Sequence, residues 1–254
     1  KGEKSIIASS LFFSLDGDWQ MTEGEEETER VNNRWKDSIS SNVPGSVHTA
    51  LVEAGKIPDP TFGKNQMIVR EEGYKTWWMK KEFSRPKNSS NEKLIFEGIC
   101  NKSTVWLNGS KLGNHEGMFG GPEFEVGHLI KEQNNLIVKL EGVPNDFLND
   151  SFYHNVGWRK TVVFNNVYGW HYSTIPPLGI WRSVKLYSQP PVIIEHPFIS
   201  TKDTQNGLMD LVIKLNGSKE AWQGKLTASI IPENFEDNEE VFYFENEIDQ
   251  SQGG

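Results

Sequence analysis

Three segments of the sequence are rich in aromatic, imidazole and glycine residues. The first covers residues 43–51 and 57–60, the second covers 96–98, 105–113 and 115–119, and the third covers 157–160, 168–172 and 178–184. Aromatic faces pack against the C–H faces of sugar rings, and an imidazole nitrogen can form a hydrogen bond with a hydroxyl group. The same residue types also build β-sandwich cores, so each segment is a candidate either for sugar contact or for packing.

Other chemistries find no support in the sequence. A nucleophile elbow, a phosphate-binding loop, a dinucleotide fingerprint and an H-E-x-x-H motif are all absent from it. The six histidines lack metal-ligand spacing, so we predict no metal site and no cofactor. A Ser-His-Asp arrangement formed in space stays open, because nothing in the sequence selects one. The acidic residues concentrate at 23–29 and 233–240, and we interpret both runs as solvated loops.

The elements that must position these segments are predominantly β-strands. Trp77, Met79 and Phe83 alternate onto one face of a predicted strand. Asn108-Gly109 is a strong hairpin signal, because both residues tolerate positive φ. We predict that Trp106 and Trp181 are core rings within strands. The one credible helix runs over 47–54, with a serine at 46 as its N-cap and a glycine at 55 closing its C-terminus.

A domain boundary is predicted near Gln189-Pro190-Pro191, because two prolines in series end a strand and stiffen a linker. Four further strand-like runs follow, with turn signals at Asn216-Gly217 and at Pro232. This pattern fits an immunoglobulin-like sandwich, which usually needs roughly 100 residues. We therefore predict an all-β chain: a β-sandwich over 1–189, followed by an incomplete immunoglobulin-like β-sandwich over 190–254.

Composition narrows the function classes. The net charge of −9 argues against a nucleic-acid partner, and no apolar run is long enough for a membrane span. Cys100 is the only cysteine and lies in an apolar run, so we predict a buried structural thiol.

Five patterns in order resemble the N-terminal part of family 2 glycoside hydrolases, especially the β-mannosidase and exo-β-glucosaminidase branch. They extend over roughly residues 11–187 and are Leu15–Trp19, Val43–Leu51 with Ile57–Pro60, Trp77–Phe83, Val105–Gly109 and Gly179–Arg182. The resemblance implies a jelly-roll (galactose-binding-like) sugar-binding domain, then an immunoglobulin-like domain, then a (β/α)₈ barrel that carries two catalytic glutamates. It also implies a periplasmic or secreted enzyme. Because retaining hydrolysis needs two carboxyl groups about 5–5.5 Å apart and the family holds both on the barrel, we predict no catalytic residues in this chain.

The resemblance further implies a sugar-contacting loop that reads G-W-D-W-G-P in the mannosidase-like branch. Here the matching stretch is Gly169–Thr174, so Trp170, His171 and Tyr172 are the candidate carbohydrate-binding residues. His171 stands where the branch has an aspartate, and an imidazole cannot accept two hydrogen bonds as a carboxylate does. The alternatives are a structural histidine at 171 and a core ring at 170.

The leading hypothesis is thus a non-catalytic N-terminal part of a glycoside hydrolase that acts on β-linked glycans. Its expected partners are a β-linked oligosaccharide and the catalytic barrel of the parent chain, for which it shapes the pocket rim. A free-standing carbohydrate-binding module is the alternative, and an autonomous small hydrolase is a third hypothesis. An exposed aromatic platform would favour the second, and two neighbouring carboxyl groups in a cleft would favour the third.

Overall fold

A computed structural model describes residues 11–32, 35–87, 89, 91–142, 175–189, 192–217, 223–230 and 242–249. The contacts divide the chain between Gln189 and Pro190 into two compact units. In the unit that ends at Gln189, the strands are β1 Leu11–Ser14, β2 Gly17–Glu23, β3 Ile39–Val43, β4 Trp77–Ser84, β5 Glu92–Phe96, β6 Lys102–Leu107, β7 Ser110–Glu116, β8 Glu123–Glu125, β9 Gln133–Glu141 and β10 Val184–Ser188. The helical elements are α1 Glu27–Val31, α2 Val47–Glu53, α3 Gln66–Val69 and the 3₁₀ turn η1 Arg70–Tyr74.

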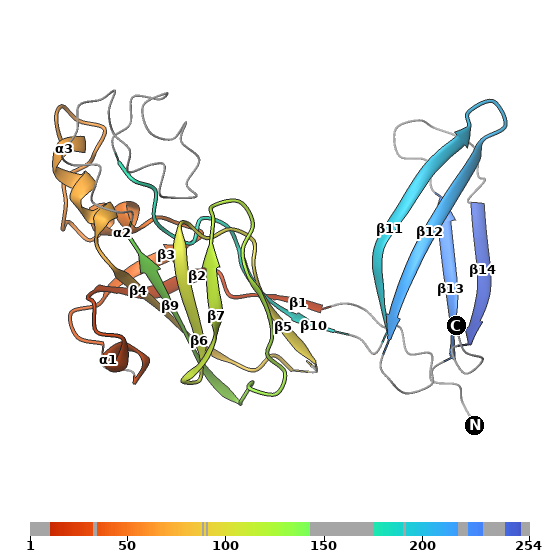
Figure 1. The fold of residues 1–254 in the computed structure, drawn as a ribbon, viewed down its shortest axis with the longest axis horizontal. Helices are drawn as coiled ribbons and strands as arrows, with labels where there is room; N and C mark the ends of the chain where they lie inside the picture. Colours follow the sequence, from red (N-terminus) through yellow and green to blue (C-terminus); the bar gives the residue numbers. More distant parts are fainter. Residues whose placement is uncertain are drawn as a thin grey trace. The chain divides into compact units, whose positions relative to one another are not determined.

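Two antiparallel sheets build this first unit (Figure 1). One has six strands in the order β3-β2-β4-β9-β6-β7, and the other has four in the order β1-β10-β5-β8. Trp19, Met79 and Val138 of the larger sheet share one buried cluster with Leu94 and Leu186 of the smaller sheet. Facing sheets that bury their alternate residues against each other form a β-sandwich. The predicted all-β sandwich is confirmed for this unit.

A second, smaller core covers the outer face of the six-stranded sheet. Trp78, Trp106 and Ile137 are buried there, and Val31 and Trp35 pack against them. The two buried tryptophan rings lie 5.4 Å apart, so the prediction of Trp106 as a core ring is confirmed. Val31 ends α1, which occupies part of the acidic run that we predicted to be a loop. That prediction is wrong for Glu23, which ends β2, and for residues 27–29, which begin α1.

Two local predictions are confirmed in detail. Helix α2 begins after Ser46, whose Oγ accepts a hydrogen bond from the backbone N–H of Thr49 at 3.0 Å. A cap of this type satisfies an amide that has no partner within the helix. The β6–β7 hairpin turns at Asn108 and Gly109, which have φ of 53° and 86°. The prediction of a single helix is wrong, because α1, α3 and η1 also form.

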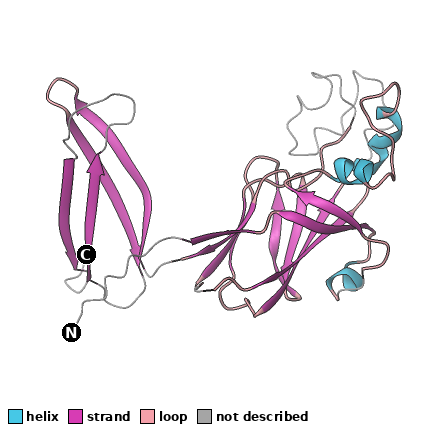
Figure 2. Cartoon of the chain, turned by 180° about the vertical axis from the view of Figure 1, so that it is seen from behind, coloured by secondary structure: helices cyan, strands magenta, loops and turns pink. Residues whose placement is uncertain are grey.

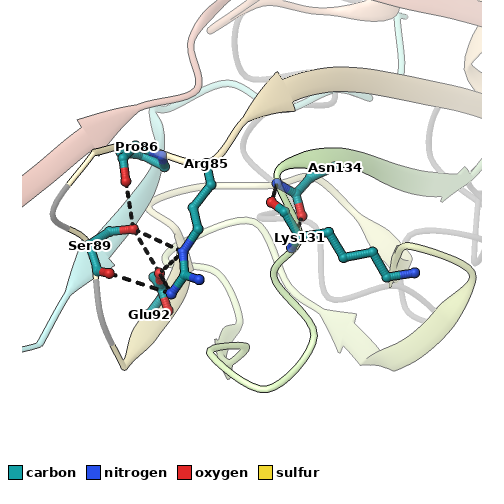
Figure 3. A network of polar contacts seen from close by, with 6 residues as sticks. All are labelled: Arg85, Pro86, Ser89, Glu92, Lys131 and Asn134. Atoms are coloured by element: carbon teal, nitrogen blue, oxygen red, sulfur yellow. Dashed lines mark hydrogen bonds and ion pairs between the residues drawn. The ribbon is translucent and has the colours of Figure 1, made fainter.

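An ion pair between the half-buried Arg85 and the buried Glu92 holds the turn between β4 and β5 (Figure 3). The Glu92 side chain is 0% exposed, and its Oε1 lies 2.7 Å from Arg85 Nη2. Ser89 Oγ donates to the same carboxylate oxygen at 2.7 Å. Burial raises the pKa of Glu92, but the hydrogen bonds from Ser89 and Arg85 and the charge of Arg85 outweigh it and leave that pKa below its usual value.

The unit after Pro190 consists, where it is described, of two antiparallel strand pairs (Figure 2). These pairs are β11 Val192–Asp203 with β12 Leu208–Gly217, and β13 Gln223–Ile230 with β14 Phe242–Asp249. The predicted turn at Asn216-Gly217 is wrong, because both residues belong to β12. The hairpin turns instead after Asp203, whose carboxylate accepts hydrogen bonds from the following amides, and Gly207 has φ +64° there.

Candidate functional site

A groove of about 600 Å³ opens beside helix α2 in the first unit. Its walls come from three places in the sequence, namely residues 45–60, residues 100 and 118, and residues 175–181. These are parts of the three segments that the sequence marked as candidates for sugar contact. The structure therefore brings portions of all three to one surface.

Main-chain hydrogen bonds of residues 178–182 join these walls. On one side the backbone N–H groups of Gly45 and Val47 donate to the carbonyls of Ile180 and Leu178 at 2.8 and 2.9 Å. On the other side Gly179 exchanges two hydrogen bonds with Cys100, at 2.8 and 2.9 Å. Segment 178–182 therefore lies between α2 and the chain that leads into β6, and we call this arrangement the junction.

Two glycines make the junction possible. Gly179 has φ +155°, and a Cβ atom at this position would lie 2.4 Å from the carbonyl oxygen of Gly45. A Cβ on Gly98 would lie 2.9 Å from the ring of Trp181. Neither position has room for a side chain, because real Cβ atoms do not approach other atoms so closely. Close backbone packing therefore explains why the Gly-Ile-Trp-Arg pattern begins with a glycine.

Trp181 forms an aromatic wall of the groove. Its ring N–H donates to the carbonyl of Met118 at 2.8 Å, and the Arg182 guanidinium carbon lies 4.8 Å from the ring centroid. The ring of Phe119 meets it edge-on, with the centroids 6.2 Å apart, and Phe119 itself is 68% exposed. Trp181 is half-buried and precedes β10, so the prediction that it is a core ring inside a strand is wrong.

His48 and Cys100 line the groove without offering reactive groups. His48 is buried, and its Nε2 lies 3.1 Å from the carbonyl oxygen of Val69. Burial lowers the pKa of His48 more than this hydrogen bond raises it, so the imidazole is neutral and ties α2 to α3. Burial raises the pKa of the Cys100 thiol to about 12, which leaves it protonated and inert. The prediction of a buried structural cysteine is confirmed.

The groove also carries carboxylate groups. Asp59 is one of its two carboxylates, and its Oδ1 accepts hydrogen bonds from the Thr61 amide and hydroxyl at 2.8 and 2.7 Å. These bonds lower the pKa of Asp59, which makes it a poor proton donor. Among the described residues, no group of three or more His, Cys, Asp and Glu side chains could hold a metal ion. In the same part of the chain, no helix has the length and apolar character to cross a bilayer.

The predicted sugar-binding residues Trp170, His171 and Tyr172 lie outside the described residues, so their role stays a prediction. Ile175 is the first described residue after them, and it lines the groove together with Pro176 and Pro177. Sequence reasoning missed this wall. The Ile-Pro-Pro-Leu-Gly run was a usable signal, because paired prolines next to a strand often mark a fixed, extended segment.

Comparison with known proteins gives this scaffold a family. Residues 19–182 match the family described as "Glycosyl hydrolase 2 galactose-binding domain-like". The chain belongs to this family. That assignment confirms the resemblance inferred from the motifs, and the junction and the groove both lie within its galactose-binding-like domain.

The relatives are glycosidases that are much longer than this chain. A β-mannosidase of Mus musculus is 31% identical over 133 residues, which cover 51% of this chain and 14% of the relative. A β-mannosidase of Bos taurus is 25% identical over 239 residues, which cover 85% of this chain and 26% of the relative. The crystal structure of a β-D-mannosidase from Dictyoglomus thermophilum superposes with a TM-score of 0.74 at 24% identity, covering 94% of this chain and 30% of that one. The chain thus spans about a quarter or less of the two mannosidase sequences and less than a third of that structure.

Proposed function

We propose that this chain is the non-catalytic N-terminal part of a glycoside hydrolase that cleaves β-linked glycans, and that its groove borders the substrate pocket. The catalytic carboxylates lie in a (β/α)₈ barrel on the remainder of the parent polypeptide. The observation that carries the proposal is the convergence of the three aromatic segments on one groove, beside the point where the 143–174 segment rejoins the described chain.

The surface near the groove suits a large partner. Phe62 and Phe119 are each 68% exposed; Phe62 follows the groove-lining Pro60 by two residues, and the ring of Phe119 contacts the groove-lining Trp181. We propose that these two rings belong to one apolar patch, because such patches on protein surfaces often mark an interface. In this proposal the patch packs against the barrel, while Trp170, His171 and Tyr172 reach the terminal sugar of the substrate.

The second unit is proposed to be part of an immunoglobulin-like sandwich. Large apolar side chains of β11 and β12 are exposed, including Phe198, Ile199 and Leu211. A sandwich with its full set of strands would bury one face of such a pair. The parent enzyme is proposed to be periplasmic or secreted, as the family resemblance implies.

The experiment is a kinetic comparison in the full-length parent enzyme, with nitrophenyl β-glycosides as substrates. Phe119→Ala removes an exposed ring at the groove, and Phe12→Ala removes a ring that is 59% exposed and stacks on Tyr187 of β10. We expect Phe119→Ala and His171→Ala to lower kcat/KM at least threefold, because both perturb the pocket rim, and Phe12→Ala to leave it unchanged.

The isolated chain tests the absence of catalytic residues. We expect it to release no nitrophenol from the β-glycosides that the parent enzyme cleaves. Turnover by the isolated chain would contradict the proposal and support an autonomous hydrolase. Equal kinetics for the Phe119, His171 and Phe12 variants would contradict the role of the groove.

A further inference from the structure

The 3₁₀ turn η1 packs against the chain on both sides of residues 143–174. On the side before them, a Cβ atom on Gly142 would lie 2.4 Å from the carbonyl carbon of Tyr74 and 2.6 Å from its oxygen. On the side after them, a Cβ atom on Gly73 would lie 2.8 Å from the ring of Pro176. Neither glycine has a φ between +20° and +160°, so the lack of space, rather than the backbone conformation, favours glycine at both positions.

These two contacts place both ends of the segment beside the groove. Gly73 and Tyr74 are adjacent, so standard bond lengths limit the distance between the Cα atoms of Gly142 and Pro176 to about 15 Å. Pro176 lines the groove, and Tyr74 packs against the groove-lining Cys100. Residues 143–174 are therefore joined to the sandwich at one element, which is η1.

The turn η1 is itself fixed to the core of the sandwich. The ring N–H of Trp77 in β4 donates to the carbonyl of Glu72 at 2.9 Å, and Trp77 is 4% exposed. Val69, which directly precedes η1, is 0% exposed, and its carbonyl oxygen lies 3.1 Å from His48 Nε2. A shift of η1 would leave polar atoms of the buried Trp77 and His48 side chains unpaired, which costs free energy. This turn is therefore a fixed support for the residues that pack against it.

We propose that Gly73 and Gly142 are positioning residues, which let both ends of residues 143–174 pack against η1 and so set where the candidate sugar-binding residues 170–172 join the sandwich. This positioning role rests on the proposed function, in which those three side chains reach the sugar. Pro176 follows residue 172 by only four positions. An alanine at Gly73 would push Pro176 away from η1 and displace the end of the segment that carries the sugar contacts.

The test in the parent enzyme compares Gly73→Ala with Gly113→Ala, with nitrophenyl β-glycosides as substrates. Gly113 is the matched control, because a Cβ atom there would lie 2.9 Å from the Phe124 ring, which is again a side chain, but Gly113 belongs to the edge strand β7. We expect Gly73→Ala to raise KM about threefold or more and Gly113→Ala to leave it unchanged, because loss of folded enzyme lowers the measured kcat but not KM. Equal KM values for the two variants would overturn the proposal.

A second experiment tests the geometry at η1 without depending on activity. Residues 143–174 are replaced by a linker of about eight Gly and Ser residues, whose root-mean-square span of roughly 14–17 Å matches the gap between Gly142 and Pro176. We expect the isolated chain with this linker to fold and to unfold cooperatively in urea, because η1 still holds both ends of the gap. A chain that no longer folds would overturn the proposal.

The same replacement in the parent enzyme separates the positioning role from the proposed function. Loss of activity with the linker, together with equal KM values for the Gly73 and Gly113 variants, would overturn the positioning role alone. Full activity with the linker would overturn both, because residues 143–174 would then contribute nothing to catalysis.

Discussion

Replacing Gly179 by alanine tests whether the junction holds the groove together. The added Cβ would lie 2.4 Å from the Gly45 carbonyl oxygen and 2.8 Å from Ser46 Cα, and both of these are backbone atoms. Segment 178–182 must then move away from α2. That movement would break the hydrogen bonds from Gly45 to Ile180 and from Val47 to Leu178.

The expected loss combines two terms. An unfavourable φ for a non-glycine residue costs about 1–3 kcal/mol, and each of two lost backbone hydrogen bonds costs about 1 kcal/mol. We therefore expect Gly179→Ala to lower the free energy of unfolding by about 3–5 kcal/mol. The assay is urea unfolding followed by tryptophan fluorescence, which reports chiefly on the first unit because eight of the nine tryptophans precede residue 190.

Gly17→Ala is the control for backbone strain alone. Gly17 has φ +86°, but a Cβ there would meet nothing within 4 Å. We expect this variant to lose only about 1–2 kcal/mol. If the Gly179 and Gly17 variants unfold at the same urea concentration, close packing of segment 178–182 against α2 contributes nothing, and the account of the junction is refuted.

Three further predictions concern single residues. Glu92→Gln should lower the free energy of unfolding by about 1.5–3 kcal/mol at pH 7. The pKa of Glu92 lies below its usual value in the fold, so the difference in free energy of unfolding between the two proteins should be complete above the usual pKa of 4.5 and should shrink as the pH falls below it. Urea titrations at pH 7 and pH 3.5 that give the same difference would contradict this. Ser46→Ala removes the hydrogen bond that caps the Thr49 amide and should lower the free energy of unfolding by about 1 kcal/mol in the same assay. An unchanged urea midpoint would show that the cap does not stabilise the fold. Cys100 should resist iodoacetamide at pH 8 in the native chain and react in urea, and rapid labelling of the folded chain would show that the thiol is accessible.

Sequence reasoning succeeded where one local signal determines the backbone. The cap before α2 and the Asn108-Gly109 hairpin both depend on a few adjacent residues, whose preferences tertiary contacts do not override. The faces of β4 were also predictable, because alternation along one strand places Trp77 and Met79 in the main core. The order of five patterns was enough to identify the family.

Sequence reasoning failed where contacts between residues that are distant in the sequence determine the local structure. The same Asn-Gly turn signal occurs at 206–207 and at 216–217. The first forms a turn, which a hydrogen bond from Asn206 to the Asp203 carboxylate stabilises. The second does not, because Asn216 pairs with Ile193 in the β11–β12 ladder. The acidic run could not show a helix, because α1 depends on Val31 packing near tryptophans that are distant in the sequence. Trp181 was misassigned for a related reason, since its ring contacts Met118, a residue of another segment.

The junction also bears on what the family patterns can say about substrate. Gly45, Gly98 and Gly179 meet backbone or ring atoms of the fold itself, so the patterns that contain Gly45 and Gly179 record how the chain packs rather than which sugar it meets. The fold is shared by proteins with different names: the β-D-mannosidase from Dictyoglomus thermophilum superposes at a TM-score of 0.74, and a β-glucuronidase of an uncultured Clostridium superposes at 0.60. Under the proposed function, sugar preference would then depend on residues that the junction does not constrain. Exchanging residues 169–174 between relatives should alter the preferred glycoside, while exchanging 178–182 should alter stability and leave that preference unchanged.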